Sequence, residues 1–362
     1  MKKTEKEFIV SEKRPQVLFL GNGICRAFGG MSWNGLLDKL KEEALYPDNA
    51  NNYLLPMPLK AAMLTNNHLA TKMRNVVKDH DKQNPKVDGY DWSSFVKVTP
   101  EMKAHLLNLI GNRFDYVLTT NYSYEIEAAI VGQDTLSASQ IGKMMHFHEV
   151  DHAQTKFLAN TFNEAMDIPI WHVHGEARKP DSMIIGSYYY GKLLRRCVER
   201  LDSSSDTDEE GKKRNSKSSK TAFFKSSVKH NKPIKIGSWI DAFVLGDVYM
   251  LGFGLDFSET DIWWLLEYKA NHRDICGSTY FYEPRKGASD TCVNDDRIPC
   301  LERSRFIDGN QCKKYLLKNT YYVVTEDLGI TASKNEDYVW FNQQAVQYIS
   351  QFVDNRLRQI KE

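Results

Sequence analysis

Four short runs of apolar residues recur along the chain, and each is followed at once by glycine or a polar turn. The runs cover residues 17–20, 116–118, 170–173 and 248–251. Continuous apolar runs of this length are typical of strands that are buried on both faces, as in a parallel sheet. Helix-like stretches lie between them. The pattern therefore predicts an α/β fold with a Rossmann-like parallel sheet, which binds its ligand at the carboxyl ends of the strands.

Two segments depart from this pattern. The region of about 41–110 begins with a polar, asparagine-rich stretch that contains a plausible helix near 59–77, and it predicts a helical insertion or lid subdomain. The region of about 202–233 contains an acidic run (DSSSDTDEE) and then a basic run (KKRNSKSSK). Such a composition cannot build a core, so it predicts a flexible loop; its basic half could contact phosphate, but a solvated loop is favoured.

The C-terminal part combines strand-like and helix-like patterns. Strands are predicted at Thr279–Tyr282 and 321–325, and apolar residues at helical spacing predict an amphipathic helix over 338–357. We therefore predict one domain over 15–325. A C-terminal segment, 326–362, would pack its helix on that domain or form an oligomer interface.

Charge and cysteine content exclude several classes of function. The chain has 362 residues, and its 48 basic side chains nearly balance its 47 acidic ones, so direct nucleic-acid binding is not indicated, although a local basic patch is not excluded. The six cysteines are too sparse for a disulfide scaffold, and no two have the CxxC spacing of a zinc ribbon. His172 and His174 could bind zinc as a His-x-His pair, but the sequence offers no obvious third ligand, so no metal is expected. No stretch approaches the roughly 20 apolar residues of a membrane span. We expect a cytoplasmic protein without a membrane contact.

Two strands end in Gly-x-Gly turns, at Gly21-Asn22-Gly23 and at Gly252-Phe253-Gly254. Glycines at such turns allow backbone amides to approach a diphosphate closely, and a following helix adds its partial positive charge. An ordinary strand-to-helix turn is the alternative. After the second turn, Ser258 and Asp261 resemble a capping box, in which Glu259 and Asp261 would stabilise the start of a helix.

The other two strands end in polar residues that could act on a substrate. Asn121, in Thr119-Thr120-Asn121, offers a neutral amide that can hold a water or a ribose hydroxyl; a helix-capping asparagine is the alternative. Strand alternation places His172 and His174 on one face, with His174 at the strand end, where it could move a proton. The alternative is one packed and one exposed histidine.

Together, the four motifs resemble those of sirtuin-like domains. The Gly21-Asn22-Gly23-Ile24 segment resembles the sirtuin GAG turn, and Trp33 with the two leucines after it resembles the P-x-W-x-x-L-L segment. Further along the chain, similar motifs are Thr119-Thr120-Asn121-Tyr122, His174-Gly175, the stretch from 183 to Tyr190, and Gly252-Phe253-Gly254-Leu255 with its acidic tail. The likeness covers about residues 15–325 and is strongest to sirtuin-like domains of bacterial antiphage defence proteins.

This resemblance implies an NAD⁺ hydrolase that releases nicotinamide and ADP-ribose, with NAD as its substrate and no metal. Carried over by motif, Asn121 and His174 are the catalytic residues. The NAD-binding residues implied by the motifs are Gly21, Asn22, Gly23, Ile24, Trp33, Thr120, Gly252, Gly254 and Leu255. The resemblance also implies depletion of NAD in abortive infection. It further implies a homo-oligomer, or a separate sensor or ATPase protein that triggers the activity.

Some residues differ from the family pattern. Ser123 stands where the TTNYD motif has an acidic residue, Asn22 replaces an alanine and Gly254 replaces a serine. The zinc cysteines of deacetylase sirtuins are absent. Two alternatives stay open: an NAD-dependent deacylase or ADP-ribosyltransferase, and a non-catalytic module that senses NAD or ADP-ribose.

Overall fold

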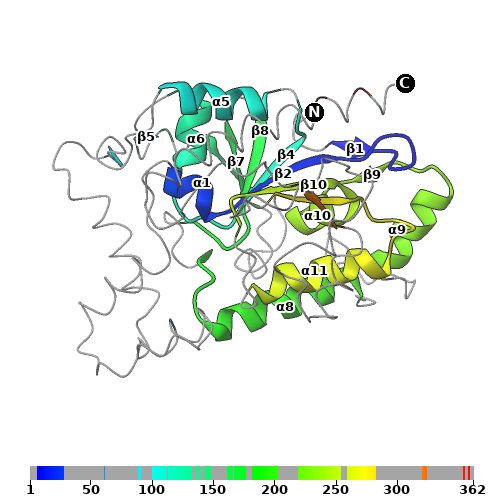
Figure 1. The fold of residues 1–362 in the computed structure, drawn as a ribbon. Helices are drawn as coiled ribbons and strands as arrows, with labels where there is room; N and C mark the ends of the chain where they lie inside the picture. The colour runs from blue at the N-terminus through cyan, green and yellow to red at the C-terminus, as the bar shows by residue number, and fades with distance from the viewer. Residues whose placement is uncertain are drawn as a thin grey trace, which may run out of the picture.

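The fold is known from a computed structural model, which describes the chain in separate stretches. The described residues are 6–27, 61, 89–90, 100–111, 113–132, 136–137, 140, 143–147, 161–165, 167–176, 182–202, 219–253, 259–282, 320–323, 354 and 358. They form a central sheet with helices on both of its faces (Figure 1).

The central sheet has eight strands in the order β12-β11-β10-β2-β4-β8-β7-β6. Those from β12 to β8 pair in parallel, while β7 and β6 continue the sheet with antiparallel pairing. In the order of the sheet, the strands are β12 (Thr320–Val323), β11 (Thr279–Tyr282), β10 (Asp247–Leu251), β2 (Gln16–Leu20), β4 (Tyr116–Thr119), β8 (Ile168–His172), β7 (Thr161–Ala165) and β6 (Met145–Phe147).

The parallel strands follow the doubly wound order. Numbered along the chain as 1 to 6, strands β2, β4, β8, β10, β11 and β12 lie in the order 3-2-1-4-5-6. The chain therefore reverses direction between β2 and β10, and sheets of this kind bind ligands at the carboxyl ends of the strands beside this reversal. The α/β class and the Rossmann-like parallel sheet predicted from the sequence are confirmed.

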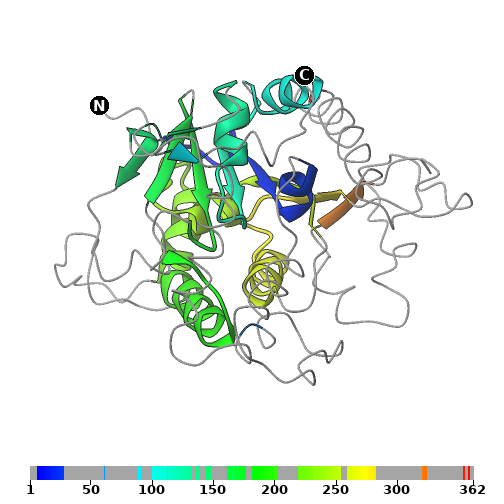
Figure 2. The ribbon, with the colours of Figure 1, turned by 90° about the vertical axis from the view of Figure 1, so that its left-hand side faces the viewer.

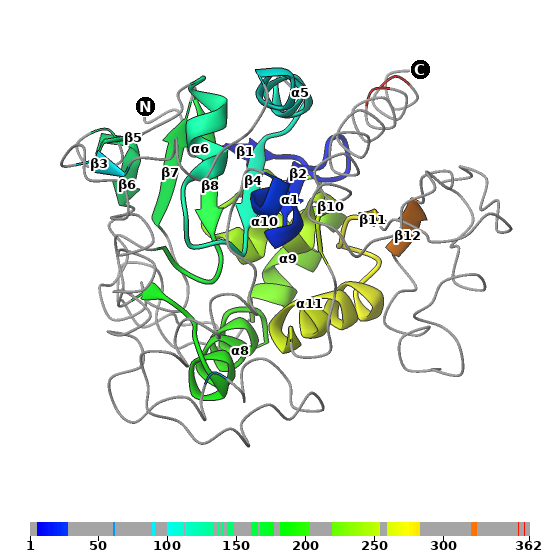
Figure 3. The ribbon, with the colours of Figure 1, turned by 60° about the vertical axis from the view of Figure 1, so that its left-hand side comes forward.

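Helices cover both faces of the sheet (Figures 1 and 3). One face carries α5 (Pro100–Ile110) and α6 (Glu125–Ile130), with α1 (Asn22–Ala27) directly after β2. The other carries α8 (Ser187–Leu201), α9 (Lys220–Lys229), α10 (Trp239–Leu245) and α11 (Thr260–Asn271). Figure 2 views this arrangement along the axes of α8 and α11, which contact each other.

The two-sided covering explains why the strands are apolar throughout. In β2, Val17 and Phe19 belong to the core cluster that includes α8, α10 and α11, whereas the alternate residues Leu18 and Leu20 are also fully buried but lie outside that cluster. A strand with only one covered face would show polar residues at every second position. Two short pairs complete the described strands: β1 (Glu7–Phe8) with β9 (Ile234–Lys235), and β3 (Gly89–Tyr90) with β5 (Leu136–Ser137).

The predicted insertion and loop have mixed outcomes. Helix α5 lies in the range 41–110, but most of that range is outside the described residues, so the lid stays a prediction. The flexible-loop prediction for 202–233 is wrong from 220 onward, because α9 occupies Lys220–Lys229 with Phe224 fully buried. Ser219 caps this helix by accepting a hydrogen bond from the amide of Ala222. Residues 203–218 are outside the described residues.

The C-terminal segment is described at two residues. Asp354, which is helical, accepts hydrogen bonds at 2.5 and 2.7 Å from the guanidinium of Arg113, just before β4. This pair attaches residue 354 to the domain; the rest of the predicted helix 338–357 lies outside the described residues. Among the helices of the described stretches, none has the length and apolar character needed to cross a membrane.

Candidate active site

The two Gly-x-Gly turns pack directly against each other at the reversal point of the sheet. The Gly21 amide donates to the carbonyl of Leu251 and the Gly23 amide to the carbonyl of Gly252, both at 2.8 Å. Gly252 has a φ of +77°, which glycine adopts readily. A Cβ on Gly21 would lie 2.5 Å from the Gly252 carbonyl oxygen, and one on Gly23 would lie 2.8 Å from it. The glycines are therefore required for the contact between the turns.

This contact changes the role expected for the first turn. The amides of Gly21 and Gly23 are already used by protein carbonyls, and that of Ile24 donates to Gly21 at 3.2 Å. They are therefore not the open diphosphate donors that the Gly-x-Gly pattern predicts. The side chain of Ile24 is fully buried, while Asn22 is partly exposed. The turn after β2 instead packs against the turn after β10 at the edge of the sheet.

Asn121 lies beside this turn, after β4. Its Nδ2 donates to the carbonyl of Gly21 at 3.2 Å and to Oγ1 of Thr119 at 2.8 Å, and its own amide donates to the same Oγ1 at 3.1 Å. The residue is buried, at 6% exposure. The side chain thus links β4 to the turn after β2, and its orientation is fixed by two acceptors. Thr120 precedes it at intermediate exposure.

His172 ends β8, next to β4, and is fully enclosed. Its Nδ1 lies 2.5 Å from the carbonyl oxygen of Asn121, and its Nε2 lies 2.7 Å from Oε1 of Glu127 on α6. Burial acts to lower the pKa of His172, but the negative charge and hydrogen bond of Glu127, with Glu176 and the Asn121 carbonyl, outweigh it and raise the pKa to about 9. His172 is therefore an imidazolium at neutral pH.

His174 lies in the turn after β8 and has a separate set of partners. Its Nε2 is 2.9 Å from Oδ2 of Asp261, at the start of α11, and its Nδ1 is 3.4 Å from the hydroxyl of Tyr190 on α8. Because a carboxylate only accepts, the neutral form of the ring would carry its proton on Nε2 and its lone pair on Nδ1. Asp261 is fully buried, and among the described residues its Oδ1 has no hydrogen-bond partner.

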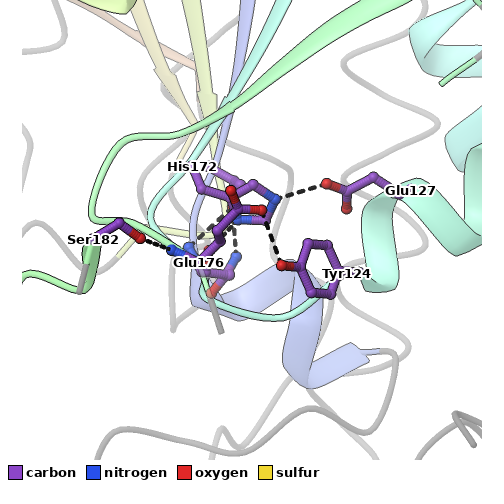
Figure 4. A network of polar contacts seen from close by, with 7 residues as sticks. Tyr124, Glu127, His172, Glu176 and Ser182 are labelled. Atoms are coloured by element: carbon purple, nitrogen blue, oxygen red, sulfur yellow. Dashed lines mark hydrogen bonds and ion pairs between the residues drawn. The ribbon is translucent and has the colours of Figure 1, made fainter. Parts of the chain in front are cut away.

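Two carboxylates, those of Glu127 and Glu176, lie around His172 (Figure 4). Tyr124 donates from its hydroxyl to Oε2 of Glu176 at 2.9 Å, and its ring meets that of His172 edge to face. The amide of Glu176 donates to Oγ of Ser182 at 3.0 Å. Gly175, between His174 and Glu176, has a φ of +89°, and a Cβ there would lie 2.2 Å from the carbonyl oxygen of Ser182. The turn that separates the two side chains therefore requires glycine.

The sequence-predicted residues are brought together in part. Gly21, Asn121, His174 and Gly252 meet at the carboxyl edge of the sheet, but His172 and His174 do not share one face: β8 ends at His172, and both are buried with different partners. Trp33, Gly254 and Leu255 lie outside the described residues, so their predicted role in NAD binding stays a prediction.

Two acidic residues of the site escaped sequence reasoning. Asp261 lies in the first turn of α11, as the sequence predicts, while the N-cap is Glu259 without a side-chain hydrogen bond; the contact of the Asp261 carboxylate with His174 is not apparent from the sequence. Glu127 had no assigned role. In the sequence, each acidic residue is followed directly by an apolar run, at 128–130 and at 262–266, and an acidic residue at the start of such a run in a buried helix requires a partner.

A scan of the chain against protein-family models finds no match, and a search of curated proteins finds none either. The site must therefore be interpreted from its own geometry. Within the described ranges, no group of three or more histidine, cysteine, aspartate or glutamate side chains is arranged to hold a metal ion.

Proposed function

We propose that this protein hydrolyses NAD⁺ at the bond between nicotinamide and ribose. The observation that carries the proposal is the position of Asn121 and the His174–Asp261 pair at one edge of the sheet, where the adjacent parallel strands β4 and β8 end, beside the reversal of a 3-2-1-4-5-6 sheet. Sheets with this order bind dinucleotides at that place. The motif resemblance to sirtuin-like defence proteins supports the same substrate and adds the expected setting, depletion of NAD during phage infection.

The chemistry requires little from the protein besides positioning and one base. As the bond between C1′ and the positively charged nicotinamide breaks, the electron pair leaves with nicotinamide, and the ribose develops oxocarbenium character. A water oxygen then bonds to C1′ and gives up a proton. The neutral amide of Asn121 is suited to orient this water or a ribose hydroxyl, since it adds no charge to the site.

His174 is suited to accept the proton. With the Nε2 proton directed to Asp261, the lone pair is on Nδ1, which among the described residues faces the Tyr190 hydroxyl at a long 3.4 Å. Asp261 holds the ring and stabilises the imidazolium that forms. Among the described residues Oδ1 of Asp261 has no hydrogen-bond partner, which supports the presence of a ligand hydroxyl here, because buried polar atoms are rarely left without a partner.

The direct test is to incubate the purified chain with NAD⁺ and to follow nicotinamide and ADP-ribose by chromatography. Asn121→Ala and His174→Ala are each expected to lower hydrolysis at least about 100-fold with the fold intact by circular dichroism. The matched control is Arg195→Ala, whose side chain is 78% exposed in an ion pair with Glu199, and it should keep full activity. Normal hydrolysis by either site variant would refute the proposal.

The same assay separates the alternatives. NAD that is bound but not consumed would identify a sensor of NAD or ADP-ribose, and an ADP-ribosylated or deacylated protein product would identify a transferase or deacylase. Because uncontrolled NAD loss is toxic, we propose that assembly or a partner, such as a sensor or ATPase protein, switches the activity on. Activity that rises more steeply than protein concentration would support self-assembly.

A further inference from the structure

His172 is the second buried histidine of the site, and the proposed reaction does not use it. Both of its ring nitrogens face groups that only accept hydrogen bonds: the carbonyl oxygen of Asn121 at 2.5 Å and the carboxylate of Glu127 at 2.7 Å. A neutral imidazole has one N–H and can satisfy only one such acceptor. The geometry therefore requires a ring with a proton on each nitrogen.

His172 contacts the main-chain carbonyl of Asn121, whereas the other hydrogen bonds of Asn121 are made by its side chain and its amide N–H. The Asn121 side chain donates to Gly21 and Thr119, and its amide N–H donates to Thr119. Within the described residues, the carbonyl of Asn121 accepts a hydrogen bond from the His172 ring. The hydrogen bond from His172 restrains the peptide that follows the Cα of Asn121, and so restrains the backbone that carries the side-chain amide.

We propose that His172 is a positioning residue: its doubly protonated ring, paired with Glu127, locks the peptide of Asn121 and so fixes the amide that faces the substrate. The inference rests on the proposed function for its catalytic consequence, but the state of the ring and its hold on Asn121 are properties of the chain itself.

The charges around the ring support a permanent imidazolium. Glu127 approaches from α6, and Glu176 from the turn after β8; Tyr124, before α6, places its ring edge against the imidazole and its hydroxyl on Glu176. His172 is 4% exposed, so water does not screen these interactions. The acidic pair makes the positive ring favourable where burial by itself would favour the neutral one.

Two substitutions separate the two hydrogen bonds of the ring. The amide nitrogen of asparagine occupies the place of Nδ1 along the side chain, and that of glutamine occupies the place of Nε2. His172→Asn therefore keeps a donor to Asn121 and loses Glu127, whereas His172→Gln keeps Glu127 and loses Asn121. Both variants remove the ring, so a role in stability alone would affect them similarly.

In NAD⁺ hydrolysis we expect His172→Gln to lower kcat by about 30-fold or more, with KM changed less than about threefold, because the chemical step depends on the position of Asn121. His172→Asn should stay within about fivefold of the wild-type kcat. Equal losses in kcat for the two variants would overturn the proposal, as would a loss confined to KM.

A second measurement does not depend on activity. Nitrogen-15 NMR of the histidine rings at pH 7.5 should show both nitrogens of His172 protonated, with assignment from the His172→Asn spectrum. In Glu127→Gln the midpoint of ring deprotonation should fall below pH 7. A neutral His172 in the wild type at pH 7.5 overturns the inference. A protonated His172 in a chain that leaves NAD⁺ intact refutes the proposed function only.

Discussion

The two ends of helix α11 each bury one charged side chain, and their partners differ in kind. At the carboxyl edge of the sheet, Asp261 contacts the side chain of His174. At the amino edge, Lys269 donates from Nζ to three main-chain carbonyls, those of Phe243, Gly246 and Ser278, at 3.0 to 3.2 Å. Both side chains are at most 1% exposed, so burial by itself does not show whether a buried ionisable residue serves the active site or only stabilises the fold.

The groups close to each end of α11 show the same division. At the amino edge, Arg14 donates to the carbonyls of Leu245 and Ile275, and Asp247 accepts from the amide of Ser278. These charges satisfy backbone groups at helix and strand ends. At the carboxyl edge, ionisable side chains pair with each other. Only the second arrangement can move a proton between side chains, which is why we place the reaction there.

The largest expected effect concerns the amino edge. Lys269→Met keeps the length of the side chain but leaves three carbonyls without their donor, and should lower the free energy of unfolding by about 2–4 kcal/mol. Urea unfolding followed by circular dichroism measures this change. The folded variant should keep its NAD⁺ turnover within about threefold. A stable variant that has lost turnover would contradict the division between the two edges.

The next effect concerns the opposite end of α11. In Asp261→Asn, the amide can donate to Nε2 of His174 and so force the ring proton onto Nδ1, where the base is needed. We expect kcat to fall about 100-fold or more, with a change in unfolding free energy below about 1 kcal/mol.

The matched control is Asp247→Asn at the amino edge, which keeps an oxygen for the Ser278 amide. Its turnover should be that of the wild type. Similar losses in kcat for the two Asp→Asn variants would contradict the proposal that Asp261 acts on the reaction through the side chain of His174.

The smallest effect is the pH dependence of stability, and it has opposite signs at the two edges. Burial lowers the pKa of Lys269 from 10.5 to about 7. Above pH 7 the side chain therefore keeps its proton in the unfolded chain but loses it in the folded one, so the unfolding free energy rises with pH. The pKa of His172 is raised from 6.5 to about 9, so its contribution is full below pH 6.5 and is lost as pH rises through 9.

Urea unfolding at pH 7, 8 and 9 separates the two contributions. As the pH rises, the unfolding free energy of the wild type should increase relative to that of Lys269→Met, by up to about 1 kcal/mol per pH unit. Relative to His172→Asn, the unfolding free energy of the wild type should decrease. Parallel differences for the two variants would contradict the assigned charge states.

Much of the sheet could be predicted from the sequence because its signal is local. The apolar runs at 17–20, 116–118, 170–173 and 248–251 fall in β2, β4, β8 and β10, with ends that differ by at most two residues, and Thr279–Tyr282 matches β11. Helix α9 was missed because the low-complexity run before it resembles disorder, while its buried Phe224 is a contact that composition does not reveal.

The sequence by itself determined which chemistry-bearing residues end the strands: the glycine turns, Asn121 and His174. It could not determine their partners, because Asp261 is 87 residues from His174 and Glu127 is 45 from His172. The tertiary structure decided that the two glycine turns bond to each other, that neighbouring histidines face different carboxylates, and that one of them is charged. Each of these depends on distances between elements and on exclusion of water, which only packing creates.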